Sequence, residues 1–213
     1  MNTLAIILII LTLATVGYAQ DTVDFGLWND VQITKPINKT TDAIVGVRFD
    51  TKRDTRSFAE QRAYAGFNFK KDRFTIQPMV LFLKIFSRVP YHEVRLQTTL
   101  SYKFTAKSKV NITPKTRVEY RAKVNLPDAG RIVPIISFDK KVSKIYSVFN
   151  TDELWLPIND SRDVAKYRKR LFFGVTRNVN KHLTLDMFYL YQRDEQVQPK
   201  NNHKLGLTWK VNL

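Results

Sequence analysis

Charged side chains recur two residues apart in several segments of this chain. The sets are Glu93 and Arg95; Arg117, Glu119 and Arg121; and Arg168 and Arg170. On an extended chain, residues two apart project to the same face. Arginine and glutamate on one face suit two kinds of chemistry: ion pairs that fill a narrow interior, or a basic pathway that selects anions.

Ten residues are predicted to line the interior of a β-barrel and form the candidate site. They are Arg48, Arg62, Glu93, Arg95, Arg117, Glu119, Arg121, Glu153, Arg168 and Arg170. In a barrel of ten to twelve strands, side chains of this length nearly block the interior, which favours an ion-pair lattice over a selective pathway. Because such pairs lose their hydration, we expect removal of Glu119 alone to cost more than removal of a surface carboxylate.

The sequence gives little support for catalysis or metal binding. None of the three histidines, His92, His182 and His203, is followed within two residues by a serine, the local arrangement of outer-membrane phospholipase A. There is no cysteine, no His, Asp or Glu cluster has metal-ligand spacing, and the seven glycines are too scattered for a phosphate cradle. No catalytic residue, metal or cofactor is therefore predicted. A lipid-modifying hydrolase stays open, because triad members need only be near in space.

The first nineteen residues predict export. They contain no Asp, Glu, Lys or Arg, and the apolar run over residues 4–16 is too short to span a bilayer but fits a signal-peptide core. Small residues at Gly17 and Ala19 predict cleavage before Gln20. Residues 1–19 are thus expected to be a signal peptide, and residues 20–213 a single domain. The net charge of +16 would suit a nucleic-acid partner, but export argues against one.

The predicted mature chain repeats one pattern, a strand of about ten residues with an apolar face and a charged face. The clearest examples are residues 42–50, 62–70, 92–104 and 109–122, followed by residues 182–192 and the last strand, 203–213. Weaker examples occur near residues 27–33, 74–82, 132–138, 144–156 and 167–177. Short basic links alternate with longer polar ones. This rhythm is typical of an up-and-down antiparallel transmembrane β-barrel.

The number of predicted strands is odd, which is unusual for a bacterial barrel. About eleven candidates can be counted, whereas bacterial single-chain barrels have an even number of strands. One of two corrections is then expected. Either residues 25–33 lie inside or cap a ten-strand barrel, or another segment divides to give twelve strands. The closing strand, residues 203–213, would pair with residues 25–33 or with residues 42–50.

The alternation of apolar and charged residues alone does not show which face of each strand contacts water. A secreted, soluble calyx would place the apolar face inside, around a small ligand, whereas an outer-membrane barrel would turn that face to lipid. Three features favour the membrane. The strands are long enough to cross a bilayer, aromatic residues gather near strand ends, and the chain ends on a closing strand with apolar residues at every second position. Such a strand resembles the signal by which barrel assembly machinery receives its clients.

Several residues then resemble an uncharacterised family of predicted bacterial outer-membrane barrels, domain of unknown function twenty-four-ninety. The resemblance is carried by Trp28, Arg62-x-Tyr64-x-Gly66, Glu93-x-Arg95, Arg117-x-Glu119-x-Arg121, Glu153, and Arg168-x-Arg170 followed by Gly174. It covers nearly the whole mature chain. It implies the barrel fold and an outer-membrane location, and it supplies no activity or ligand.

The sequence therefore predicts an outer-membrane barrel of structural or narrow solute-pathway role rather than an enzyme. Its expected partners are outer-membrane lipid, including lipopolysaccharide phosphates that basic links could contact, and the barrel assembly machinery during biogenesis.

Overall fold

A computed structural model describes residues 23–52, 57–86, 90–158, 167–194 and 200–213. Its elements are the strands β1 (Val23–Pro36), β2 (Thr41–Lys52), β3 (Ser57–Lys71), β4 (Phe74–Ile85), β5 (Tyr91–Tyr102), β6 (Phe104–Thr105), β7 (Val110–Lys123), β8 (Ala129–Lys141), β9 (Tyr146–Pro157), β10 (Arg168–Asn178), β11 (Leu183–Asp194) and β12 (Asn201–Asn212). No helix long and apolar enough to cross a membrane occurs in these ranges. The expected signal peptide, residues 1–19, lies outside the described residues.

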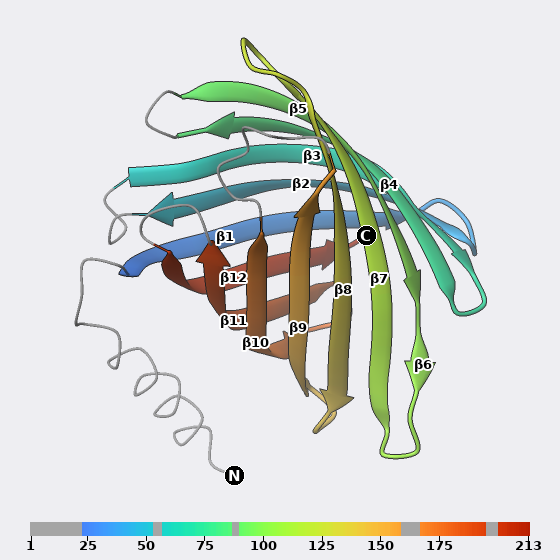
Figure 1. Ribbon diagram of the computed structural model, residues 1–213. Coiled ribbons are helices and arrows are strands. Elements are labelled where there is room, and N and C mark those ends of the chain that lie inside the picture. Colours follow the sequence, from blue (N-terminus) through green and yellow to red (C-terminus); the bar gives the residue numbers. More distant parts are fainter. Residues whose placement is uncertain (1–22, 53–56, 87–89, 159–166, 195–199) are drawn as a thin grey trace.

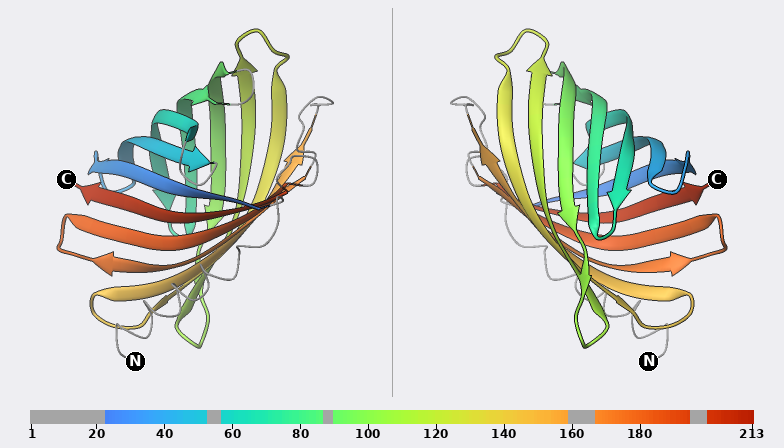
Figure 2. Two further views of the ribbon diagram at one scale, coloured as in Figure 1. Left: turned by 90° about the vertical axis from the view of Figure 1, so that its left-hand side faces the viewer. Right: turned by 90° about the vertical axis from the view of Figure 1, so that its right-hand side faces the viewer.

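The strands form one closed sheet in which each pairs with its neighbours in sequence (Figures 1 and 2). β6 continues β5 after a break at Lys103, and both pair with β7, so the barrel has eleven strands. The predicted all-β, up-and-down barrel is thus confirmed. The expected even number of strands is wrong, because β1 and β12 close the barrel as a parallel pair, from Val23 opposite Asn201 to Thr34 opposite Asn212. Residues 25–33 belong to a barrel strand, and they are the partner of the closing strand.

The two ends of the barrel differ in their links, and we name them accordingly. At the turn end, the links after β1, β3, β6, β8 and β10 have two to four residues. At the loop end, the links after β2, β4, β7, β9 and β11 have four to ten residues. Because the strand number is odd, β1 begins at the loop end whereas β12 finishes at the turn end.

The exterior of the barrel is apolar and most of the charged side chains of the strands point inward. In β2, Val45, Val47 and Phe49 are exposed, whereas Arg48 and Asp50 lie on the interior side. In the last strand Leu207 and Trp209 are exposed while Lys204 is buried, as the alternation predicted. A soluble calyx does not fit this arrangement, since its polar face would have to be outside.

Aromatic side chains gather on the exterior near both ends. At the loop end, Phe58 packs between Phe49 and Phe86, with ring centres 6.4 and 5.8 Å apart. At the turn end, the ring of Tyr102 lies 4.7 Å from that of Phe74 and 6.2 Å from that of Phe104. Two aromatic bands around an apolar belt are typical of a barrel that meets membrane interfaces.

Candidate functional site

Glutamates and arginines form a connected group inside the loop half of the barrel. We call this group the Arg/Glu lattice. It consists of Glu93, Arg95, Arg117, Glu119, Arg121, Arg131 and Glu153. Three strands contribute most of it: β5 carries Glu93 and Arg95, β7 carries residues 117–121, and β8 adds Arg131. The register of the barrel places these strands side by side, which turns a sequence pattern into a cross-strand network.

Glu119 is the centre of the lattice. Its carboxylate lies 2.6 Å from Arg131, 2.7 Å from Arg117 and 3.6 Å from Arg95, and the residue is only 2% exposed. Glu93 is as deeply buried and receives Arg95 at 2.6 Å and Arg121 at 2.9 Å. Because each carboxylate faces more than one guanidinium, removing either would leave buried cations without compensation.

Two tryptophans extend the lattice by stacking against guanidinium groups. Arg131 and Arg170 lie 3.9 and 4.2 Å from the ring centre of Trp155, and Trp155 Nε1 donates a hydrogen bond of 2.9 Å to Glu153. Arg170 also lies 5.6 Å from the ring of Trp28, which Arg48 approaches to 3.8 Å. The sequence Arg48, Trp28, Arg170, Trp155, Arg131 is therefore a ladder of alternating cations and rings across the interior, and cation–π contacts of this kind strengthen when desolvated.

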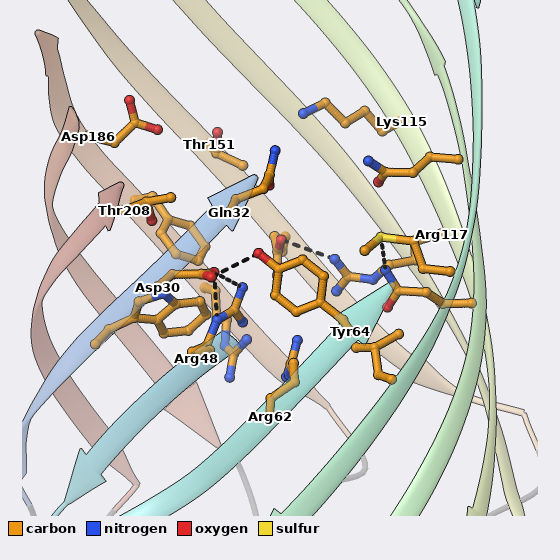
Figure 3. A pocket seen from close by; sticks show the side chains of 18 of the residues that line it. Asp30, Gln32, Arg48, Arg62, Tyr64, Lys115, Arg117, Thr151, Asp186 and Thr208 are labelled. Atoms are coloured by element: carbon orange, nitrogen blue, oxygen red, sulfur yellow. Dashed lines mark hydrogen bonds and ion pairs between the residues drawn. The ribbon is translucent and has the colours of Figure 1, made fainter. Parts of the chain in front are cut away.

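A second polar group lies beside Trp28 and is shown in Figure 3. Asp30 accepts hydrogen bonds from Arg48, at 2.9 and 2.6 Å, and from the Tyr64 hydroxyl at 2.9 Å. Tyr64 can cross the strand to reach Asp30 because Gly46 leaves room: a Cβ there would lie 2.3 Å from the Tyr64 ring. Gly206 makes the same kind of space for Phe188, whose ring would lie 2.1 Å from an added Cβ.

The interior next to the loop-end mouth is closed by further pairs. Arg168 binds Asp194 at 2.5 Å, and Arg170 donates to Gln192 at 2.7 Å. Lys204 of β12 forms an ion pair with Asp50 of β2, reaching across β1 and so joining both sides of the parallel closure. The first two contacts join β10 to β11, and the Lys204–Asp50 pair ties the closure of the barrel together from inside.

All ten residues predicted to line the interior lie there. Six are buried, namely Glu93, Arg95, Glu119, Arg121, Glu153 and Arg170, and the other four are half-buried. Arg62 pairs with Glu60 at 2.5 Å, apart from the lattice. Five further interior residues were not predicted from the sequence: Arg131, Trp155, Asp30, Asp194 and Lys204. Arg131 and Lys204 sit on strands whose inward faces also carry apolar or small residues, so their charge did not stand out as part of a pattern.

The interior changes character along the barrel axis. In β7, the inward side chains of Arg121 and Glu119 are buried, whereas those from Arg117 to Asn111 are half-exposed. The same change occurs in β5 after Arg95 and in β8 after Ile135. A cavity of about 350 Å³ lies against the lattice and extends toward the turn end. Its wall includes Gln32, Lys115, Thr151 and Thr208 (Figure 3), together with Lys210. The loop half of the interior is thus filled, and the turn half is hollow.

The histidines do not assemble a hydrolytic site among the described residues. His203 lies between the rings of Tyr189 and Tyr191, and its Nδ1 contacts the Tyr189 hydroxyl. His182 Nδ1 contacts the backbone oxygen of Asn212 at 2.8 Å. In the part of the chain that the structure describes, neither pairs with a serine or a carboxylate, and no three His, Cys, Asp or Glu side chains group as metal ligands would.

Comparisons with known proteins agree with this architecture. The profile of the family described as "Protein of unknown function (DUF2490)" matches residues 25–203. The chain belongs to this family. The resemblance predicted from Trp28, the Arg/Glu sets and Gly174 is therefore confirmed. No curated protein matches the chain.

Among solved structures, the chain is similar in fold to the beta domain of the Bordetella autotransporter Brka. The TM-score is 0.51 at 10% sequence identity, and the match covers 81% of each chain. At this identity the likeness concerns the fold alone.

Proposed function

We propose that this protein is a bacterial outer-membrane β-barrel that is closed to solutes, with a structural role for the Arg/Glu lattice as its internal plug. The observation that carries the proposal is the burial of Glu93, Arg95, Glu119 and Arg121 inside the loop half. A conducting pore needs a continuous wet path, and side chains that contact one another across the interior remove it.

The outer-membrane location is supported by three observations. The exterior belt is apolar, the aromatic residues form two bands, and the fold is similar to that of an autotransporter beta domain. In hydrocarbon, closure is also the only way for a sheet to satisfy all its backbone groups, and the parallel pairing of β1 with β12 provides it. Export by a signal peptide over residues 1–19, assembly by the barrel assembly machinery and contact of basic links with lipopolysaccharide phosphates are parts of the same proposal.

Migration on detergent gels tests the barrel in a membrane. A folded outer-membrane barrel is expected to sediment with outer membranes and to migrate differently before and after boiling. Recovery in the aqueous fraction with a single gel position would contradict the proposal.

Sidedness is testable because the chain contains no cysteine. We expect a membrane-impermeant thiol reagent to label Leu126→Cys, at the loop end, on intact cells, and to label Ser108→Cys, at the turn end, only after the outer membrane is opened. The reverse pattern would place the loop end in the periplasm.

Recordings in planar bilayers test closure. The purified protein should give no single-channel steps. A narrow anion pathway is the second candidate, favoured by the basic cavity of the turn half, and steady conductance of the unmodified protein with anion selectivity would establish it instead.

A further inference from the structure

The cavity in the turn half has more positive than negative groups in its wall. Seven basic and four acidic side chains line it. The basic ones are Arg48, Arg62, Arg95, Lys115, Arg117, Arg170 and Lys210, and the acidic ones are Asp30, Glu119, Glu153 and Asp186. Arg62 and Arg95 also reach Glu60 and Glu93 beyond the cavity. Without those two, five basic side chains of the wall face four acidic ones, which leaves an excess of one positive charge.

Lys115 differs from the other cations of the cavity. Arg117 pairs with Glu119 at 2.7 Å and with Glu153 at 3.6 Å, and Lys210 pairs with Asp186 at 2.5 Å. Among the described residues, the Lys115 ammonium has no hydrogen bond or ion pair, although it points into the cavity (Figure 3). The charged groups near enough to act on it are Glu153, Lys210 and Arg117. The Lys115 ammonium thus faces two cations and a single carboxylate, that of Glu153, which already pairs with Arg117.

A second donor in the same wall also lacks an acceptor. Trp28 is 7% exposed, and its Nε1 makes no hydrogen bond within the described part of the chain. Buried N–H groups are rarely left unpaired, since an unpaired one loses the hydrogen bond that water gives it in the unfolded chain. The hydroxyl of Thr208 lies in the wall as well. The cavity therefore offers cationic and neutral donors that no group of the protein accepts.

We propose that this cavity binds a small oxyanion with two or more negative charges, a phosphate or a polycarboxylate, which enters from the turn end. Lys115 is its principal ligand, and Arg117 and Lys210 flank it. A volume of about 350 Å³ lies at the lower end of the range of small-molecule pockets. Oxyanions of this kind are favoured over chloride, because their several acceptor oxygens can receive hydrogen bonds from more than one donor at the cost of ordering one molecule. This binding site is a proposal separate from the closure of the barrel, and it does not depend on whether the barrel conducts ions.

Calorimetric titration of the detergent-folded protein, at constant ionic strength, tests the site with inorganic phosphate and with citrate. We expect saturable binding of at least one of them, a loss of affinity of tenfold or more in Lys115→Gln, and affinity within threefold of the original in Lys115→Arg. Lys107→Gln is the matched control, because it removes the same charge from an exposed turn. Phosphate binding without citrate binding would assign the phosphate class, and the converse would assign the polycarboxylates.

A second measurement needs no variant. Bound anion should slow acetylation of Lys115 by an amine-reactive reagent, followed by mass spectrometry, and leave Lys107 unaffected. The proposal is overturned by absence of binding of both anions, by equal effects of Lys115→Gln and Lys107→Gln, by equal competition from chloride, or by lack of protection at Lys115. Each of these readings is made in detergent, so it can fail while the membrane location and the absence of conductance still hold.

Discussion

The two halves of the barrel interior are built from the same strands, but one is filled by side chains and the other contains a cavity. In the loop half, carboxylates and guanidinium groups contact each other and leave little space, as around Glu119. In the turn half, the inward positions of the same strands carry Lys115, Thr151 and Gln97, which are half-exposed around a cavity. Two-residue periodicity specifies only that a side chain points inward. Whether the interior is filled depends on side-chain length and on the partner that the register brings opposite.

The largest expected difference between the halves is in the cost of removing a carboxylate from the lattice. Glu119→Ala should lower the free energy of unfolding by about 3–5 kcal/mol, since it leaves Arg117 and Arg131 buried without their partner. Urea unfolding of the detergent-folded protein measures this. Asp152→Ala is the control, because Asp152 pairs with Lys169 at 3.6 Å where both side chains are partly exposed, and it should cost less than about 1 kcal/mol. Equal costs would mean that the lattice is not desolvated.

The stacked ring of Trp155 gives the next largest effect. Trp155→Leu removes the surface on which Arg131 and Arg170 lie and the hydrogen bond to Glu153. We expect a loss of about 2–4 kcal/mol from these contacts together. If the ladder also closes the interior, the variant should show intermittent current in planar bilayers where the unmodified protein is silent. A stable, silent Trp155→Leu barrel would show that the ring fills space without organising the arginines.

Close packing over glycine should give a smaller loss. Gly206→Ala forces the Phe188 ring away from β12, and we expect a cost of about 1–3 kcal/mol, as for other overpacked interiors. Thermal unfolding followed by gel migration would measure it. Phe188→Leu combined with Gly206→Ala should recover part of the loss, since the smaller side chain vacates the space that the new methyl group enters. Failure of the pair to improve on Gly206→Ala would indicate backbone strain instead.

The smallest effect is expected in the turn half. Thr151→Val removes a hydrogen bond of 2.9 Å to the Ser137 hydroxyl in a half-exposed part of the interior, where water can replace it. We expect a change of about 1 kcal/mol or less in the free energy of unfolding. A cost comparable to that of Glu119→Ala would remove the distinction between a filled and a hollow half.

Much of the fold could be read from the sequence because alternation is a local property. The inward and outward positions of β2, β5 and β7 agree with those predicted, and so does the apolar outer row of β12. The odd strand number was not predicted, because bacterial single-chain barrels generally have an even number of strands. The parallel pairing of β1 with β12 is the physical reason that the count was right.

The candidate site was predicted as a set of residues but not as a set of contacts. Arg131 reaches Glu119 only because β8 lies next to β7 in one particular register, with Arg131 opposite Glu119. The stacking of Trp155 between Arg131 and Arg170 joins β8, β9 and β10, and no spacing within one strand predicts it. Such partners depend on interstrand register, which the alternation within one strand does not reveal.

The parallel closure also bears on how the chain could be rearranged. In a barrel with an even number of strands, the first and last strands end side by side, and a short linker can join them to create new termini elsewhere. Here Val23 pairs with Asn201, whereas Leu213 bonds to Thr34, so the two strand ends are a whole strand apart. At about 3.3 Å per residue, the gap is roughly 35–40 Å. A circular permutant of this barrel would therefore need a linker of at least about eleven extended residues running along its wall.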